Sequence, residues 1–445
     1  MKKLLFIISA VICICSNTLL SGEAPLDDDK IIHLMKENQV PGVSLTLIDN
    51  GEIVFSKGYG KTSGVLGKPV DNETLFQMAS ISKPVVAAVA LQLVDRGILS
   101  LETPVISYLK TPYLEKDDRT SSITLHELLN HTAGLSNNLF PKDKRLVNNP
   151  GEKFLYSGIG YDYLTEVIKQ ATGKTLQENA EKLFFETVGM NNSSFKMPYM
   201  MTGNEAPPSM PVMYHIIVSI VPLLLIILIL TIFLSIWRRI LKKQKVMQRY
   251  FFLVLFVSIL LELIIVALLL VKLVLIVSIV VALFFIIYMI LTRLIKKQKI
   301  SFLITILIFT IVAFIPVQLP FDITPPGESA AYSLVSNSAE LGKFVQCLVD
   351  DSNNESWKNI LKKDVVINST DSWGLGIGLC EYEGRSIAWH TGINTGATSL
   401  FVVDLTNKKA VICITNGNNG IEVGSKIVSE YMGIDKKWDV NIESD

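Results

Sequence analysis

The stretch FQMASISKPVVA, residues 76–87, is the most informative short segment of this chain. Ser80 and Lys83 stand three residues apart in it, where a polar, turn-like run gives way to a helix-forming one. Because positions i and i+3 share a face of a helix, the lysine amine lies beside the serine hydroxyl and can accept its proton if burial lowers the amine's pKa. Two interpretations follow: an activated serine nucleophile, or a helix start with a solvated lysine, since this short pattern often arises by chance.

Ser82 is a rival nucleophile in the same stretch, because it is adjacent to Lys83. Side chains at positions i and i+1 do not face each other on a helix, whereas those at i and i+3 do. Ser80 is therefore the preferred nucleophile of the two.

The composition indicates which partners and cofactors to expect. The 445 residues suffice for one large domain or two, and the formal net charge of +0 indicates no nucleic-acid partner. The five cysteines form no C-x-x-C or Cys/His cluster, so we expect neither a metal site nor a disulfide framework. The sequence also lacks a glycine-rich phosphate loop, and no cofactor is expected.

The N-terminal segment, residues 1–24, has the pattern of a secretory signal. Two lysines precede an apolar run of roughly a dozen residues, and small and polar residues follow. No clean small-x-small cleavage site lies between Ser16 and Ala24, so an uncleaved N-terminal anchor is the alternative. In either case we expect the residues that follow to be exported.

A long apolar segment, residues 207–320, interrupts the ordinary globular sequence. We predict a transmembrane insertion of four helices, at about 213–237, 250–271, 273–293 and 300–317. The cationic loops RRILKKQK and IKKQK then fall on the same, cytoplasmic side of the bilayer, and both flanks lie outside the cytoplasm. The turn between the second and third spans contains Lys272 but neither glycine nor proline.

Glu262 lies near the middle of the second predicted span. Acids inside a membrane are costly and often functional, as in proton relays or ligand contacts. The alternative is an acid that pairs within the helix bundle or is simply tolerated.

The two globular parts, residues 25–206 and 321–445, are expected to form one domain that the insertion splits in sequence. Asn50-Gly51 between two alternating runs predicts a β-hairpin, and strand patterns return near the C-terminus. Helices are expected from Pro84 to Gly97, where the helix is amphipathic, and over 123–134, 158–174, 338–351 and 420–433. A sheet built from both ends of the chain with a helical region between them is an α+β fold.

Five short motifs follow one another in the two globular parts: SISK (80–83), HTAGL (131–135), PGEKFLYSG (150–158), WGLGIG (373–378) and HTG (390–392). In this order the sequence resembles the serine β-lactamase-like hydrolases, which include class C β-lactamases, D-alanyl-D-alanine carboxypeptidases, D-aminopeptidases and related esterases. The resemblance covers roughly residues 30–200 and 327–435. It implies a β-lactamase-like fold, an antiparallel sheet flanked by helices plus a helical region.

The resemblance also implies roles for individual residues. Ser80 becomes the acylated nucleophile, Lys83 its proton acceptor, and Tyr156 the group that shuttles protons to the leaving group and activates the deacylating water. The backbone N–H groups of Ser80 and Ile393 form the oxyanion hole. The remaining expected site residues are His390, which begins the third motif, and the substrate-binding positions Thr391, Gly392, Gly158 and Asn416.

Two of these positions depart from the lactamase and penicillin-binding pattern. His390 replaces a lysine, so a permanent cation for a substrate carboxylate becomes a weaker, pH-dependent one. Gly158 replaces the asparagine of a Tyr-x-Asn motif, so the amide that contacts the substrate's peptide group is missing there. Both departures favour a D-aminopeptidase or an esterase over a β-lactamase.

Three further polar residues have alternative interpretations. Asn416 ends the last predicted strand, where it reaches a substrate carboxylate or only forms a turn. His126 and His131, within the predicted helix over 123–134 and its Gly134 stop, are expected to be structural.

The favoured hypothesis is a multi-pass cell-membrane serine hydrolase with its catalytic domain on the extracytoplasmic side. It acts through a Ser80 acyl-enzyme on small D-amino-acid-containing peptides, cell-wall peptides or esters, with the lipid bilayer as its other partner. The alternative is a catalytically weak penicillin-binding or sensor-type protein that binds ligand in the Ser80 pocket. Its short cytoplasmic loops would then require a membrane protein partner. A third hypothesis is an accessory of an export system, in which Glu262 matters.

Overall fold

The computed structural model describes residues 26–63, 67–139, 142–196, 205–211, 318–320, 327–350 and 356–440, with a few single positions between 290 and 305. The chain divides into two compact units, Met1–Met210 with Gln318–Asp445, and Pro211–Val317. The predicted signal or anchor, Glu262 and nearly all of the four predicted spans lie outside the described residues. Within the described part, no helix is long and apolar enough to cross a membrane.

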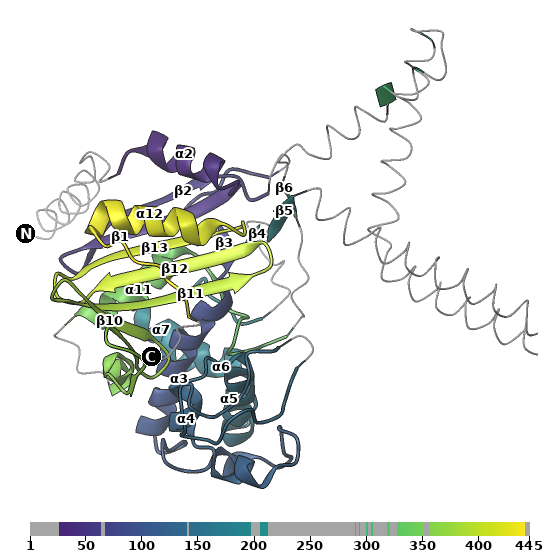
Figure 1. Ribbon diagram of the computed structural model, residues 1–445, viewed down its shortest axis with the longest axis vertical. Helices are drawn as coiled ribbons and strands as arrows, with labels where there is room; N and C mark the ends of the chain where they lie inside the picture. Colours follow the sequence, from purple (N-terminus) through teal and green to yellow (C-terminus); the bar gives the residue numbers. More distant parts are fainter. Residues whose placement is uncertain are drawn as a thin grey trace, which may run out of the picture. The chain divides into compact units, whose positions relative to one another are not determined.

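The larger unit is built on an eight-stranded antiparallel sheet (Figure 1). The strand order is β2-β1-β13-β12-β11-β10-β9-β8, so both ends of the chain contribute, as predicted. The strands are β1 Gly42–Asp49, β2 Glu52–Gly60, β8 Val365–Val366, β9 Asp371–Trp373, β10 Gly378–Tyr382, β11 Arg385–Asn394, β12 Ala397–Asp404 and β13 Lys409–Thr415. The β1–β2 hairpin turns at Asn50-Gly51, both with positive φ, which confirms the predicted turn.

Side chains of the central strands alternate between two apolar layers. On β12, Leu400 and Val402 pack in the cluster that holds α2 (Asp28–Glu37) and α12 (Gly420–Met432). Phe401 and Val403 pack in the other cluster, with α11 (Ser338–Val349) and the helical region. Because successive side chains of a strand point to opposite faces, helices cover both faces of the sheet (Figure 1).

The helical region lies between the two sets of strands in sequence. It contains the α-helices α3 Ser82–Asp95, α4 Leu125–Leu129, α5 Gly158–Thr172, α6 Leu176–Ala180 and α7 Glu186–Val188. Short helical turns are η1 Ala79–Ile81, η2 Val105–Tyr108, η3 Asp118–Ser122, η4 Glu181–Phe185 and η6 Ser356–Leu361.

Two helices differ from their predictions. The predicted amphipathic helix, α3, is instead buried on every side from Ser82 to Leu93, because its alanines and valines let neighbouring elements approach closely all round. The helix α4 ends at Leu129, earlier than predicted, because His131 adopts a positive φ that a continuing helix excludes.

Two small sheets lie where the chain leaves and re-enters the larger unit. One joins β4 (Glu205–Ala206), β3 (Leu75–Gln77) and β7 (Val335–Ser336) in that order. The other pairs β5 (Ser209–Pro211) with β6 (Gln318–Pro320). The strands β5 and β6 are therefore neighbours, although more than a hundred residues separate them in sequence.

Candidate active site

Ser80 sits at a sharp turn between β3 and α3, in the short helical turn η1. The preceding Ala79 has a φ of 47°, an uncommon conformation for a residue with a side chain, and functional sites often hold such strain. This turn leaves the Ser80 side chain half-buried, whereas Lys83, in the first turn of α3, is only 1% exposed. The sharp turn therefore keeps the serine accessible while the lysine is taken out of water.

The Lys83 amine contacts the Ser80 hydroxyl directly. Its Nζ lies 3.0 Å from Ser80 Oγ and donates to the carbonyl oxygen of Ala331 at 2.8 Å. Burial lowers the pKa of this amine from 10.5 to about 7, although the negative charge of Asp162 opposes the shift. A large fraction of Lys83 is thus neutral near pH 7 and able to accept the Ser80 proton, so the solvated-lysine interpretation does not hold.

Ser82 is excluded as a nucleophile by its hydrogen bonds. Its side chain is fully buried, its hydroxyl donates to Ala79 O at 2.6 Å, and it accepts from Leu334 N at 2.9 Å. These bonds hold η1 against the segment before β7, which is a structural role.

Tyr156 lies just before α5, with its ring 5.0 Å from Lys83 Nζ. Its hydroxyl is buried and has no hydrogen-bond partner among the described residues. Burial raises the pKa of Tyr156, and the nearby Ser80 hydroxyl offsets only part of this effect. The tyrosine is therefore neutral, with its hydroxyl near that of Ser80.

His390, on β11, is fully buried. Its Nδ1 lies 2.7 Å from the carbonyl oxygen of Thr391, which only accepts, so Nδ1 carries the proton and Nε2 does not. Burial, followed by the positive charge of Lys83, lowers the pKa of His390 to about 3. The expectation that His390 is a pH-dependent cation is therefore wrong. His390 is neutral at physiological pH, because a charge on it would be buried away from water and would lie near the positive charge of Lys83.

His131 packs against Tyr156 and Trp373, which the sequence alone does not suggest. Its ring centroid is 4.4 Å from that of Tyr156 and 5.5 Å from that of Trp373. Its Nδ1 accepts from Ser157 N at 3.1 Å, so the proton of the neutral ring is on Nε2. Burial also lowers its pKa, and His131 thereby holds Tyr156 in place as an uncharged aromatic wall.

The strand β11 passes very close to Ser80 at Gly392. A Cβ at Gly392 would lie 2.3 Å from Met78 O and 3.0 Å from Ser80 N, so only glycine fits. Thr391 is buried next to it, and Ile393, on the other side, is 65% exposed. The backbone around Gly392 and the Ser80 N–H are therefore neighbours, as the predicted oxyanion hole requires.

Asn416 has a different environment from the predicted one. Its side chain is fully buried, and its amide donates to the carbonyl oxygens of Thr62 at 2.7 Å and Lys61 at 3.3 Å. The amide protons are used inside the protein, so we no longer assign Asn416 to the substrate.

Asp162 is a residue of the site that sequence reasoning missed. It lies on α5, is 6% exposed, and accepts hydrogen bonds from Tyr113, Lys142 and, at 2.9 Å, Ser329 Oγ. Ser329 Oγ in turn accepts from Ala331 N at 3.2 Å, in the residue whose carbonyl holds Lys83. Thr165 and Glu166, three and four residues further on, share its helix face, so no signal in the sequence distinguished this acid from a solvated one.

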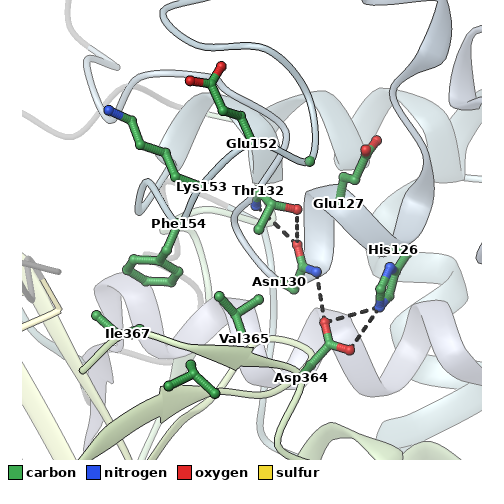
Figure 2. A pocket seen from close by; sticks show the side chains of 12 residues that line it. His126, Glu127, Asn130, Thr132, Glu152, Lys153, Phe154, Asp364, Val365 and Ile367 are labelled. Carbon is green, nitrogen blue, oxygen red and sulfur yellow. Dashed lines mark hydrogen bonds and ion pairs between the residues drawn. The ribbon is translucent and has the colours of Figure 1, made fainter. Parts of the chain in front are cut away.

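His126 contributes to a separate pocket of about 510 Å³ between α4 and the residues before β8 (Figure 2). Its Nε2 lies 3.0 Å from Asp364 Oδ1, and Asn130 Nδ2 donates to Asp364 Oδ2 at 2.7 Å. These bonds join the two globular parts of the chain and give His126 the structural role that the sequence favours. Within the described residues, no group of three His, Cys, Asp or Glu side chains is arranged to hold a metal ion.

Known proteins share both the sequence pattern and the fold. Residues 28–200 match the family described as Beta-lactamase. Over 192 residues the chain is 30% identical to Esterase EstB of Burkholderia gladioli, and the aligned part covers 36% of this chain and 48% of the esterase. The chain thus matches about half of the length of that relative.

Two solved structures have the same fold at low identity. The penicillin-binding protein homologue from Pyrococcus abyssi has a TM-score of 0.60 and 18% identity, over 92% of this chain and 78% of that one. D-alanine carboxypeptidase AmpC from Burkholderia cenocepacia has a TM-score of 0.59 and 16% identity, over 91% of this chain and 97% of that one. The larger unit is therefore a β-lactamase-like domain. By sequence, the likeness to the Beta-lactamase family covers residues 28–200, the first part of this unit.

Proposed function

We propose that this chain is a membrane-bound, extracytoplasmic hydrolase that cleaves esters or small peptides, D-amino-acid-containing or cell-wall peptides among them, through an acyl-enzyme on Ser80. The observation that carries the proposal is the 3.0 Å contact between Ser80 Oγ and the Nζ of a fully buried lysine. A lysine whose pKa falls to about 7 is a proton acceptor matched to neutral pH.

The reaction follows from the groups around Ser80. Ser80 Oγ forms a bond to the substrate carbonyl carbon while its proton passes to Lys83 Nζ, and the oxyanion is stabilised by the backbone N–H groups of Ser80 and Ile393. The C–N or C–O bond then breaks, and the leaving amine or alcohol takes a proton from Tyr156, which regains one from Lys83. Water attacks the acyl-serine while its proton passes to the same pair, and that proton returns to Ser80 Oγ as the bond between Oγ and the acyl carbon breaks.

The uncharged third motif supports a particular substrate class. A lysine in this motif would bind a carboxylate, but His390 is buried and neutral and offers no positive charge. Substrates without a carboxylate at that point, such as esters and peptides with a free N-terminus rather than a nearby C-terminus, fit this pocket better than penicillins do.

The decisive experiment is labelling of the detergent-purified protein with a fluorophosphonate probe, read by intact mass. One adduct per chain is expected for the wild type, and none for Ser80→Ala. Esters, D-aminoacyl peptides and penicillin are then compared as substrates. A folded wild-type protein that takes no label contradicts the proposal.

The membrane location rests on the sequence pattern and on one structural feature. The strands β5 and β6 are paired, so the chain leaves and re-enters the catalytic unit at the same place. An insertion that crosses a bilayer an even number of times satisfies this requirement. Fractionation and protease accessibility in intact cells test it, and a protein that alkaline carbonate releases from membranes would contradict it.

A ligand-binding sensor is the second candidate, and the state of Tyr156 favours it. Burial raises the pKa of Tyr156, which makes the hydroxyl a poor base for the deacylating water. An acyl-enzyme that forms rapidly and persists for hours after one burst of product would indicate a sensor. Continued turnover at the burst rate would indicate a hydrolase.

A further inference from the structure

The carbonyl oxygen that accepts from Lys83 belongs to a tight turn, residues 329–333, just before β7. Ser333 N donates to Ser329 O at 3.1 Å, and Ser329 N donates to Ser333 Oγ at 2.8 Å. Ser329, Ala330 and Ala331 are at most 1% exposed. The peptide groups of this turn therefore depend on partners inside the protein.

Two side chains of α5 hold this turn from one face of the helix. Asp162 and Thr165 are three residues apart, so they share a face. Asp162 Oδ1 accepts from Ser329 Oγ at 2.9 Å, and Thr165 Oγ1 accepts from Ala330 N at 2.8 Å. The turn is thus fastened to the helix that begins two residues after Tyr156.

Ser329 extends this contact to the residue that holds Lys83. Its hydroxyl has a single proton, which it donates to Asp162, and its oxygen accepts from Ala331 N at 3.2 Å. On the next peptide group, Ala331 O accepts from Lys83 Nζ at 2.8 Å. Buried hydrogen bonds therefore lead from α5 to the amine, and the acceptor at their far end is a carboxylate.

The Ala331 carbonyl constrains where the lone pair of the neutral Lys83 amine points. A neutral amine has two N–H donors and one lone pair, and a carbonyl only accepts, so one N–H is directed at Ala331 O. Nζ also lies 3.0 Å from Ser80 Oγ, whose proton the lone pair must receive. If the carbonyl turned away, the amine would rotate about its last bond and would face the hydroxyl correctly for less of the time.

We propose that Ser329 is a positioning residue for proton transfer from Ser80 to Lys83. Together with Asp162 it fixes the Ala331 carbonyl, which in turn directs the lone pair of the amine at the nucleophile. Asp162 thus acts on the lysine in two separate ways, through its charge and through these hydrogen bonds. The inference rests on the proposed function, and both positioning residues lie outside the five sequence motifs.

The test is the second-order rate constant of fluorophosphonate labelling of the full-length protein, measured by intact mass from pH 5 to 9. Ser329→Ala removes the hydroxyl and both of its hydrogen bonds. We expect the plateau rate above pH 8 to fall about tenfold, the value of one hydrogen bond. The midpoint should stay at the wild-type pH, because the burial of Lys83 and the charge of Asp162 remain.

Ser44→Ala is the matched control variant. Ser44, on β1, is also 1% exposed, its Oγ accepts from Ser338 N at 3.2 Å, and it bonds Ser338 Oγ at 2.8 Å. These bonds hold α11 and not the turn at 329–333. Ser44→Ala should lose a similar free energy of unfolding in urea and keep the wild-type plateau. If Ser329 had only a structural role, the two variants would label at the same rate.

Two variants of Asp162 separate its charge from its hydrogen bond, and they decide the question if Ser329→Ala does not fold. Asp162→Asn keeps an oxygen for Ser329 Oγ, whereas Asp162→Ala does not. Both remove the charge, so their midpoints should move alike, but the plateau of Asp162→Ala should be about tenfold below that of Asp162→Asn.

Equal plateaus in the two Asp162 variants, or a wild-type plateau in a folded Ser329→Ala protein, overturn the proposal. A folded wild-type protein that takes no label contradicts the serine-hydrolase function instead. The two failures are therefore distinguishable in the same assay.

Discussion

Acylation of Ser80 is expected to depend on pH with a midpoint of about 7, because only the neutral amine of Lys83 accepts the serine proton. With a pKa of about 7, about half of the amine is neutral at pH 7 and about one tenth at pH 6. The rate should therefore fall about tenfold for each pH unit below the midpoint and be constant above pH 8. An unperturbed lysine, at 10.5, would instead give a rate that still rises at pH 9.

The fall in labelling rate below pH 7 is expected to report the protonation of Lys83 and not that of the rings around it. The pKa of His390 falls to about 3 and that of His131 is also lowered by burial, whereas burial raises those of Tyr156 and Tyr161. None of these four rings therefore titrates near pH 7. The assay is the second-order rate constant of fluorophosphonate labelling, measured by intact mass from pH 5 to 9.

A second variant tests the cause of the midpoint. The charge of Asp162 raises the pKa of Lys83 against the effect of burial, so Asp162→Asn should move the midpoint to lower pH. Asp143, which is partly exposed and pairs with Arg145, provides the control variant Asp143→Asn with an unchanged midpoint. A wild-type rate that does not change between pH 5 and 8, or a midpoint that rises in Asp162→Asn, refutes the reasoning.

Three more substitutions test individual contacts. Lys83→Met should abolish labelling yet raise the free energy of unfolding in urea. This gain in stability should be largest below pH 7 and shrink toward pH 10.5. Between these two values the unfolded chain binds the lysine proton and the folded chain does not. Ser82→Ala should keep one label per chain but lose about 1–3 kcal/mol of stability, because Leu334 N is left buried without its acceptor; loss of the label would reopen Ser82 as the nucleophile. Gly392→Ala should slow labelling at least about 100-fold, since its Cβ overlaps Met78 O beside the oxyanion hole, and a normal rate would contradict that geometry.

The sequence predicts the parts of this fold that local chemistry determines. The Asn50-Gly51 hairpin turns where expected, and the helix α5 begins at Gly158 as predicted and ends at Thr172, two residues before the predicted end, because turn and capping residues act within a few positions. The pairing of Ser80 with Lys83 also follows from spacing alone. These features need no knowledge of distant residues.

Long-range features were missed for the same physical reason. The burial of α3 on all sides and the neutrality of His390 depend on what packs around them, which spacing does not show. Asn137 and Gly158 are 21 residues apart, and no pattern in the chain indicates that one fills the space beside the other. The same holds for Asp162, whose link to Lys83 runs through Ser329 and Ala331.

The segment before β7 contacts the turn that carries Ser80, and so links the two globular parts of the chain in one unit. The nucleophile turn is held from that side: Met78 N donates to Leu334 O at 2.8 Å, Leu334 N donates to Ser82 Oγ, and Ala331 O accepts from Lys83. The family match at residues 28–200 includes Ser80 and Lys83 but not the carbonyl that orients the lysine. Because β7 follows directly at Val335, a displacement of this segment would move the acceptor of Lys83 and the support of the nucleophile turn together. The segment Pro211–Val317 thus stands, in sequence, between Ser80 and the residues that hold its turn in place.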